Sequence, residues 1–566
     1  MSTFQRGYLV RYVIRTLACL GACAFFAIFA YAAPTVTVLA PKAGMSVGSP
    51  IFYSAYATSA ACTKGIAAMR IYTADHVSAY TVNGAHIETF IKLNPGTYNT
   101  VVQAWDNCGS VGKTTVNLTV SSTAGVTVFL PNVPSPSAPV HIAASAQNSA
   151  CAAGINAIRI YIADHVSPYT INSNQLNAYI NLVPGTYKLT VQAWDNCGHV
   201  YKSQFNQPVT TTPDAYLYAV NVNTSAPDIY QFKIASDGVL KNPNGNNALP
   251  EYSAGTGADT LAVDPGGWFV YASSIDGIYG YQINPTTGNL TTVPGSPFPL
   301  QNYGNGVPPS ISVDPSGNFL FARYGGIELG IMSPYRIDRS SGALTTTGFE
   351  VNTAWISRAF DPSGQYVYVI DSSNYGDVVG YRIDPNDGAM PTLPGNPFYT
   401  LDISTTVMDS TGSFLYVGGV ADSGGAIDAF TISYSTGLLT PMTGSPFLVP
   451  DAQLWGILAD PQTRFLWAYE QGSTRGIRAF SITPGTGSLV PSGYFAGLDP
   501  YYIGGWTEDH SGKYIFTGYK VGNPNNGESP GVASWPISGN GDLLAETIFF
   551  TQNPIGSIAV ARKNPN

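Results

Sequence analysis

A short phrase that recurs seven times in the C-terminal part of the chain constrains its fold more than any other feature. Each copy has an aromatic or apolar strand, a polar turn closed by glycine, and an apolar residue two positions later. A period near fifty residues with strand-like flanks is typical of a β-propeller, whose blades bury their faces against one another. The seven glycines are Gly238, Gly288, Gly342, Gly388, Gly437, Gly487 and Gly541.

A second phrase, Asp-Pro-x-Gly or a relative between two strands, runs in step with the first. Six copies are complete, and the seventh is split between the two ends of the region. Residues 558–561 supply its first strand and residues 215–219 its second. A blade shared in this way closes the ring and removes an open sheet edge. We therefore predict an all-β fold that ends in a seven-bladed β-propeller over residues 212–566.

A different repeat, with an offset of 89 residues, precedes the propeller. Residues 65–77 return at 154–166, and the phrase Ala-Trp-Asp-Asn-Cys-Gly occurs in both copies. Units of this length with alternating strands and Pro-Gly turn signals predict two immunoglobulin-like β-sandwiches. We place them at residues 34–122 and 123–211.

Four of the six cysteines keep the same 89-residue offset, which favours one disulfide in each sandwich. Metal binding is the alternative, but neither pair has a second Cys or His pair at zinc-type spacing, so we expect no metal and no cofactor. Oxidised cysteines indicate an extracytoplasmic protein. The expected pairs are Cys62 with Cys108 and Cys151 with Cys197.

The first 33 residues have the order of a secretory signal peptide. Arginines precede an apolar run at 17–29, and small residues at 30–33 offer a cleavage site near Ala32 or Ala33. Two alternatives remain open. The phrase that ends at Cys23 resembles a lipoprotein box, and an uncleaved apolar run would anchor the chain in a membrane. We expect a secreted, periplasmic or cell-surface protein, with membrane contact only through an uncleaved signal.

The charge balance argues against a nucleic-acid partner. Three of the 25 basic residues lie in the expected signal, which leaves 22 against 34 acidic residues and a net charge near −12. Such a chain repels phosphate backbones, and it has no cluster of lysines and arginines to overcome that repulsion.

The propeller resembles the lactonase family of seven-bladed propellers, which is related to the YVTN surface-repeat proteins. The resemblance rests on the Asp-Pro-Ser-Gly turns, the Thr-Gly-x-Leu hairpins and three Gly-Ser/Asn-Pro-Phe phrases, and it covers about residues 213–566. The sandwiches resemble bacterial immunoglobulin-like modules through Arg-Ile-Tyr and Pro-Gly-Thr-Tyr phrases. The resemblance implies a candidate lactone or sugar-acid hydrolase that works without a metal. The chain departs from the acid/base groups that the family implies on the loop face, because its one propeller histidine, His510, lies in a turn on the opposite face.

Alignment of the innermost strands separates residues that the closed ring requires from residues that could bind a ligand. The position four residues before the turn aspartate is small in every blade and carries no carboxylate, so we expect no metal in the central channel. Its residues are Thr260, Ser310, Ser357, Thr405, Gly456, Gly505 and Ser557.

Two charges interrupt apolar positions of the same strands. Arg358 takes the place of Leu261 and Ile311 and is our leading candidate for anion binding, with an ion pair between blades as the alternative. Glu508 interrupts a neighbouring position and is a candidate general base, with a structural ion-pair role as the alternative. These two residues form the predicted catalytic set.

Aromatic and acidic residues gather in the segments that should form the loop face of the propeller. Flat rings beside carboxylates suit stacking on sugars with hydrogen bonds to hydroxyl groups, and packing between blades is the alternative role. The predicted ligand-binding residues are Trp355, Trp455, Tyr501, Tyr502, Trp506, Tyr324, Asp371 and Glu470.

Two functions from different classes fit the sequence. The favoured one is a secreted or periplasmic binding or adhesion protein, whose loop face binds a glycan, another small molecule or a cell-surface protein. The alternative is an extracytoplasmic, metal-independent lactonase that uses Arg358 and nearby carboxylates. Arg358 opening into a pocket with an acidic residue would favour the enzyme, whereas burial against a carboxylate of a neighbouring blade would remove its main residue.

Overall fold

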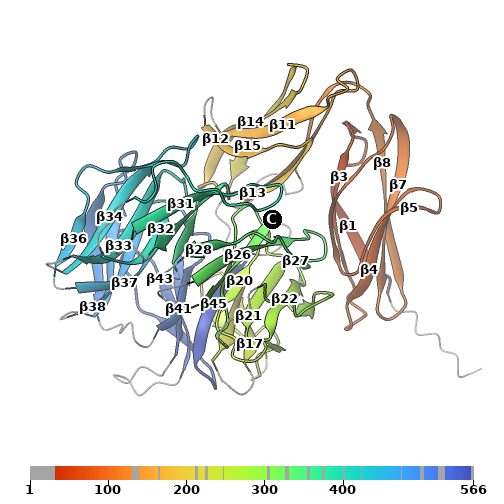
Figure 1. The fold of residues 1–566 in the computed structure, drawn as a ribbon. Coiled ribbons are helices and arrows are strands. Elements are labelled where there is room, and N and C mark those ends of the chain that lie inside the picture. The colour runs from red at the N-terminus through yellow and green to blue at the C-terminus, as the bar shows by residue number, and fades with distance from the viewer. Residues whose placement is uncertain are drawn as a thin grey trace, which may run out of the picture.

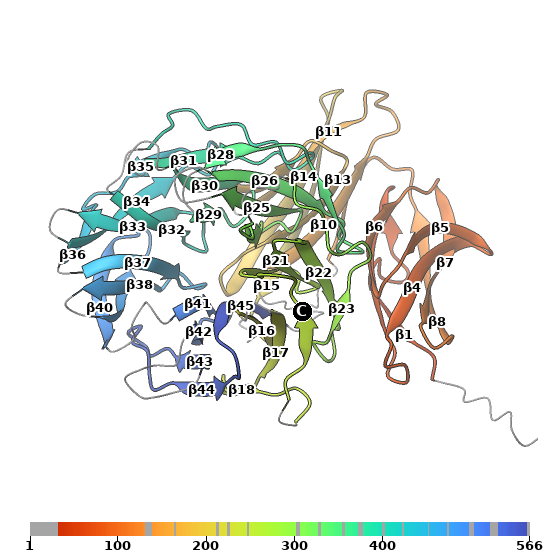
Figure 2. The ribbon, with the colours of Figure 1, turned by 60° about the horizontal axis from the view of Figure 1, so that its bottom comes forward.

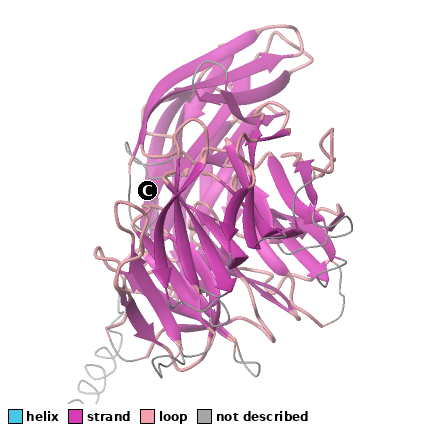
Figure 3. Cartoon of the chain, turned by 90° about the vertical axis from the view of Figure 1, so that its left-hand side faces the viewer, coloured by secondary structure: helices cyan, strands magenta, loops and turns pink. Residues whose placement is uncertain are grey.

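A computed structural model describes the chain as an assembly of β-strands joined by turns and loops. Within the described ranges there is no helix, as Figure 3 shows. A search of those ranges for a helix long and apolar enough to span a membrane found none. Nearly all of the expected signal, residues 1–31, lies outside the description. The described residues are 32–130, 139–162, 166–210, 214–222, 227–245, 248–301, 306–325, 330–353, 357–371, 377–398, 402–421, 424–450, 452–472, 475–496, 503–520 and 530–562.

The first N-terminal unit is a pair of β-sheets packed face to face. Alternation along its longest strand, Gly96–Asp106, turns Val102 and Ala104 into the core between the sheets. One sheet has the order β1 (Thr35–Ala40), β3 (Ile51–Thr58) and β6 (His86–Ile91). The other has the order β2 (Ser46–Val47), β8 (Val111–Val120), β7 (Gly96–Asp106), β4 (Ile66–Ala74) and β5 (Val77–Val82).

The second unit repeats this arrangement, and both units lie beside the propeller in Figure 1. Two β-sandwiches were predicted and are present; their assignment as immunoglobulin-like stays a prediction. One sheet has the order β13 (Gln175–Ile180), β10 (Val140–Gln147) and β9 (Gly125–Phe129). The other has the order β12 (Val166–Ile171), β11 (Ile155–Ile162), β14 (Gly185–Asp195) and β15 (Val200–Val209).

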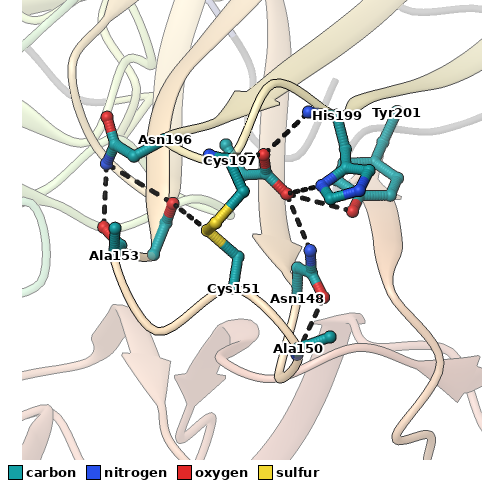
Figure 4. Close-up of a disulfide and its surroundings, with 10 residues drawn as sticks. Asn148, Ala150, Cys151, Ala153, Asn196, Cys197, His199 and Tyr201 are labelled. Carbon is teal, nitrogen blue, oxygen red and sulfur yellow. Dashed lines mark hydrogen bonds and ion pairs between the residues drawn. A yellow bond between two sulfur atoms is a disulfide. The ribbon is translucent and has the colours of Figure 1, made fainter.

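Both expected disulfides are formed, Cys62–Cys108 and Cys151–Cys197. Beside the second one, the buried carboxylate of Asp195 organises the loop around the sulfur atoms. It accepts hydrogen bonds from the backbone N–H of Cys197 at 2.9 Å and from the Asn148 amide at 2.7 Å. Figure 4 shows Asn148, His199 and Tyr201 converging on this carboxylate, next to the disulfide. The disulfide and the carboxylate together fix a turn that the sequence repeats in both units.

The C-terminal part forms seven sheets over its described residues, arranged as a ring in Figure 2. The split blade is confirmed: β16 pairs with the last strand, β45, in a register that sets Leu217 opposite Val560. This blade contains β45 (Ile555–Ala561), β16 (Tyr216–Asn221), β17 (Asp228–Ile234), β18 (Leu240–Lys241) and β19 (Glu251–Ser253). The next two contain β20 (Leu261–Val263), β21 (Phe269–Ser274), β22 (Gly277–Ile283) and β23 (Leu290–Thr292), then β24 (Ser310–Val313), β25 (Phe319–Gly325), β26 (Gly330–Ile337), β27 (Leu344–Thr346) and β28 (Val351–Thr353).

The remaining four blades continue in chain order around the ring. They contain β29 (Arg358–Phe360), β30 (Tyr366–Asp371) and β31 (Asp377–Arg382); β32 (Asp402–Met408), β33 (Phe414–Ala421), β34 (Gly424–Ile432), β35 (Leu439–Pro441) and β36 (Phe447–Pro450); β37 (Ala452–Ala459), β38 (Phe465–Gly472), β39 (Gly476–Ile482) and β40 (Leu489–Ala496); and β41 (Ile503–Glu508), β42 (Tyr514–Tyr519), β43 (Gly531–Pro536) and β44 (Thr547–Phe550).

The repeated aspartate ties together the turn that follows each innermost strand. Asp314 is fully buried and accepts hydrogen bonds from the backbone N–H groups of Ser316 at 3.0 Å and Phe319 at 2.7 Å. Buried N–H groups need such acceptors, so the repeat keeps an aspartate at this position. The same pair of bonds, to the second and fifth residues after the aspartate, forms at Asp264, Asp361, Asp409 and Asp509.

The repeated glycine links each blade to its neighbour. Gly342 has a φ of 76°, which favours glycine, and its carbonyl accepts a hydrogen bond at 2.8 Å from the Tyr271 hydroxyl of the preceding blade. The bond recurs from Tyr218 to Gly288, from Tyr368 to Gly437 and from Tyr416 to Gly487, and an indole N–H supplies it from Trp467 to Gly541. Both repeated motifs therefore stabilise the ring: the aspartate holds the turn within a blade, and the glycine accepts a hydrogen bond from the preceding blade.

Replacement of Asp314 by alanine is expected to lower the free energy of unfolding of the propeller by about 1–3 kcal/mol, because two buried N–H groups lose their acceptor. Urea denaturation followed by near-ultraviolet circular dichroism measures the change. Asp237 is a matched control, since its exposed carboxylate accepts one backbone N–H bond at 3.2 Å. D237A should cost less than about 1 kcal/mol. An equal loss in the two variants would contradict the proposed role of the turn aspartate.

Both sandwiches dock on the face of the propeller that carries these turns. The backbone N–H of Tyr179 donates to the Ser316 carbonyl at 3.3 Å, and that of Glu88 donates to the Ser340 hydroxyl at 2.7 Å. Ser316 belongs to an aspartate turn and Ser340 to a glycine hairpin, and in an antiparallel four-stranded blade both connections lie at the same end. The variable loops and the entries to the innermost strands form the opposite face, which we call the loop face.

Candidate functional site

Arg358 lies in an innermost strand, β29, and reaches across to the preceding blade. Its Nε donates to the Ser312 hydroxyl at 2.6 Å, and Nη2 donates to the Ser310 carbonyl at 3.2 Å. Burial, with a smaller contribution from the positive charge of Arg323, lowers the pKa of Arg358 to about 10, which leaves the guanidinium charged at neutral pH. Among the described residues, the charge that acts on the pKa of Arg358 is that of a second cation, Arg323.

Arg323 is the second cation of this region, and the sequence analysis missed it. It lies in β25, is 3% exposed, and stands opposite Ser310 in the strand register. Its Nη1 donates to the Gly325 carbonyl at 2.9 Å, and the guanidinium packs against the backbone of Gly330, where a side chain would clash with it. Alignment of the second strands would have revealed it, because Ser273 occupies the equivalent place in the blade before. Two guanidinium groups around Ser310, one buried and one half-buried, favour the approach of an anion.

A carboxylate also borders this region, again outside the predicted set. Asp259 is exposed and directly precedes Thr260, one of the small residues of the innermost strands. The Thr260 hydroxyl accepts from the Ile311 N–H at 3.1 Å and donates to the Pro309 carbonyl at 3.2 Å. These two bonds flank Ser310, so Thr260 lies on one side of Ser310 and Arg358 on the other. The Asp259 carboxylate lies near Gly556 of β45.

Glu508, the predicted general base, lies in a different environment. It is 8% exposed at the turn end of β41, beside the turn carboxylates Asp460 and Asp509. Burial and the charge of Asp460 raise the pKa of Glu508 well above its usual value, which favours its neutral form. Arg464 neutralises Asp460 through bonds of 2.7 and 2.9 Å. The charged groups around Glu508 do not include Arg358, and the structure does not bring the two predicted catalytic residues together.

Among the described residues, Trp455 is the accessible member of the predicted aromatic set, with 56% of its surface exposed. Trp506 is half-buried, packs over Gly456, and has its ring centroid 5.6 Å from that of Tyr469. A large exposed indole such as that of Trp455 is suited to stacking on a sugar.

The other predicted ligand-binding residues divide into two groups. Tyr324 is buried and shares a hydrogen bond of 2.5 Å with Tyr335, and Glu470 is buried in an ion pair of 3.0 Å with Arg478. Both side chains therefore have a structural role. Trp355, Tyr501 and Tyr502 lie outside the described residues, as does the side chain of Asp371.

His510 has a structural partner on the turn face. Its Nδ1 lies 2.8 Å from the buried carboxylate of Asp214, at the start of the propeller. Across the described ranges, the groups of three potential metal ligands are Cys62, Asp106 and Cys108, and Cys151, Asp195 and Cys197. Their sulfur atoms are bound in disulfides, so neither group offers thiolate ligands.

Comparison with known proteins yields lactonase-type relatives. No protein-family model matches the chain. A 6-phosphogluconolactonase from Formosa agariphila is 26% identical over 219 residues, which is 36% of this chain and 56% of that protein, so the chain spans about half the length of this relative. A solved candidate 6-phosphogluconolactonase from Bacteroides uniformis is 18% identical with a TM-score of 0.48, over 62% of this chain and 99% of that one. The periplasmic gluconolactonase of Pseudomonas aeruginosa is 15% identical with a TM-score of 0.47, over the same shares.

These relatives bear on the two functions that the sequence left open. The 6-phosphogluconolactonase from Formosa agariphila agrees with the lactonase alternative better than with the binding or adhesion protein that the sequence analysis favoured. The fold resemblance to the lactonase propellers is supported, whereas the YVTN relationship stays a prediction.

Proposed function

We propose that the chain is an extracytoplasmic lactonase-type hydrolase that opens the ring of a sugar-acid lactone at the loop face of its propeller. The observation that carries the proposal is the pair of neighbouring arginines in the wall of the ring, of which Arg323 is buried and Arg358 is half-buried. The relative from Formosa agariphila supports the reaction class. The two disulfides support the location, because disulfides persist in oxidising compartments.

The reaction needs an oxyanion to be stabilised and a water molecule to be deprotonated. Arg358 would stabilise the negative oxygen that forms when water attacks the lactone carbonyl. Asp259 would accept the proton from that water. Collapse of the tetrahedral intermediate then breaks the ring C–O bond, and the proton passes to the leaving oxygen. One lactone and one water give one hydroxy acid, and the small residues around the channel supply no metal ligands for an alternative route.

Replacement of Arg358 by alanine is expected to lower kcat/KM for a hydrolysed sugar lactone by about 100-fold or more, because one charged stabiliser of the oxyanion is lost. D259N should lower kcat by a comparable factor with little change in KM. A pH-stat assay on a panel of aldonolactones measures both changes. R382A is the matched control, since Arg382 is exposed on β31 and should leave turnover unchanged.

Three outcomes separate the hypotheses. Unchanged turnover in R358A would reject this site and keep the activity. Turnover by no lactone, together with binding on a glycan array that W455A abolishes, would restore the binding-protein hypothesis, which the exposure of Trp455 favours. Turnover that D259N leaves intact would assign the base to another residue.

A further inference from the structure

A buried carboxylate lies where the two sandwiches and the propeller meet. Glu88, on β6 of the first sandwich, is 6% exposed. Its Oε2 lies 3.1 Å from Nη2 of Arg339 in the propeller and accepts a hydrogen bond of 3.1 Å from Asn177 in the second sandwich. Its Oε1 faces two histidines, with His86 Nε2 and His141 Nδ1 each 3.6 Å away.

Aromatic stacking holds both histidines in place at this junction. The His86 ring lies parallel to Trp268 of the propeller, with 3.9 Å between centroids and 17° between planes. His141 stacks on Tyr179 at 4.4 Å and bonds to the Asn177 amide at 2.6 Å. His86 is fully buried, and His141 is 3% exposed. A change in either imidazole therefore acts directly on the contact between the three parts of the chain.

The charge of this cluster is balanced while both histidines are neutral. Glu88 carries one negative charge, and Arg339 carries one positive charge beside it. Protonation of either histidine adds a second positive charge to the cluster. The described carboxylate of the cluster is Glu88 alone, so this added charge is not balanced. Burial lowers the pKa of His86 to about 4, with Arg339 and His141 adding to the effect and Glu88 opposing it. Burial also lowers the pKa of His141.

A metal site is the other arrangement that two histidines and a carboxylate suggest. The described groups that bring three such ligand atoms within metal-binding reach are those around the two disulfides, and this cluster is not among them. The Arg339 guanidinium also occupies one side of the carboxylate. Protons, not metal ions, are therefore the expected ligands.

We propose that the cluster of Glu88, His86, His141 and Arg339 is a proton-sensitive latch, in which protonation of either histidine releases the first sandwich from the second sandwich and the propeller.

The sign of the pH dependence follows from the two states of each group. A histidine whose pKa is lower in the docked form binds its proton more readily in the released form, so docking weakens as the pH falls below about 6.5. His86 alone should shift the docking equilibrium about 30-fold between pH 7.5 and pH 5. Arg339, His141 and His86 lower the pKa of Glu88 to about 2 against the effect of burial, so this group adds to the loss of docking below about pH 4.5.

One nearby carboxylate acts in the opposite direction. Asp264 faces Arg339 and Tyr179, and burial raises its pKa to about 6. To the extent that docking buries Asp264, protonation of its carboxylate between about pH 6 and pH 4 favours the docked form. Asp264 also receives three backbone hydrogen bonds from its own turn, which persist in the released form. Its opposing effect is therefore smaller than that of the two histidines. Burial raises the pKa of Tyr179 well above 10, so Tyr179 does not titrate in this range.

Hydrogen exchange at amides that bond across the junction measures release directly. The reporters are the N–H groups of Glu88, bonded to Ser340, and of Ala85, bonded to Gln282. The N–H of Tyr179, bonded to Ser316, reports separately on the contact between the second sandwich and the propeller. After correction for the intrinsic effect of pH, the protection of the Glu88 and Ala85 amides in the full chain is expected to fall about 30-fold or more from pH 7.5 to pH 5. Amides of the propeller strand β33 should keep their protection over the same range.

Variants without the titrating rings test the assignment. H86F keeps a ring to stack on Trp268, and H141Q keeps a side chain able to bond to Asn177. The double variant should retain its protection at pH 5, whereas H76Q, at an exposed histidine far from the junction, should behave like the wild type. Equal loss of protection in wild type and double variant would overturn the latch, as would constant protection in the wild type. If the double variant does not dock at pH 7.5, the single variant H141Q provides the test. Its change in amide protection between pH 7.5 and pH 5 should be smaller than that of the wild type, because His141 no longer contributes. An unchanged pH response would overturn the role of His141.

Discussion

Arg339→Ala is expected to weaken the docking of the first sandwich by about 3–5 kcal/mol. The reason is the position of Glu88, which would keep a charge in the buried junction without its nearest cation. Breaking a buried ion pair by removing one partner is more harmful than removing both, because one charge remains without compensation. The double variant R339A/E88Q should therefore recover much of the loss, since the amide keeps the shape of the carboxylate without its charge.

The measurement uses exchange of the junction amides of Glu88 and Ala85 at increasing urea concentration, which gives the free energy of docking separately from that of global unfolding. R382A serves as a control for the loss of one arginine, because Arg382 is exposed on β31 and distant from the junction in the strand order. A docking free energy that is the same in wild type and R339A would contradict the role assigned to this ion pair. So would a double variant that is weaker than R339A.

Removal of the disulfide in the second sandwich, as C151A/C197A, is expected to destabilise that sandwich by about 4 kcal/mol. The bond joins residues 46 positions apart, and a loop of that length restricts the unfolded chain by about this amount. Cys151 is also buried and lies in the turn that Asp195 organises, so the variant loses packing as well.

The first sandwich offers a matched comparison, because Cys62 and Cys108 are also 46 positions apart. C62A/C108A should destabilise the first sandwich by a similar amount, and each variant should leave the midpoint of the propeller unchanged. Chemical denaturation with exchange resolved by segment measures the three units separately. A fall in propeller stability equal to that of the altered sandwich would contradict the expectation that each disulfide acts within its own unit.

Much of the fold could be predicted because the repeated residues serve the backbone. Asp314 and its equivalents hold the same turn in blade after blade, and Gly342 and its equivalents accept the same bond from the preceding blade. Such requirements leave the same residue at the same place, so alignment of the copies reveals them. The split blade was predicted for the same reason, since the ends of the region each carry the half-phrase that the other lacks.

The docking of the sandwiches could not be predicted, because it depends on residues at which the repeats differ. Glu88 and Asn177 occupy equivalent positions in the two sandwiches, 89 residues apart, and they bond to each other in the folded chain. Neither residue follows a pattern that marks it as an interface. His86 likewise stands where the second sandwich has Gln175. Contacts between unlike members of a repeat leave no periodic signal.

The candidate site was predicted in part. Arg358 stood out because it interrupts an apolar position of the innermost strands, and the structure places it beside a second arginine. Glu508 stood out for the same reason, yet it lies in the carboxylate cluster of the turn face. A break in a repeat identifies an unusual residue but not the end of the blade at which its side chain lies. Asp259 escaped notice because a carboxylate in a variable segment breaks no pattern.

The pairing of β16 with β45 also governs the order in which the protein can fold during synthesis. Both sandwiches and six of the sheets are complete in sequence before Ile555–Ala561 leaves the ribosome. More than three hundred residues separate the first propeller strand, β16, from its partner β45, so β16 is synthesised long before it can pair. Until then its edge and the adjacent face of β20 are open to other chains, which is the condition under which unpaired strands aggregate. The need for help from chaperones should therefore last until β45 is available and the ring closes.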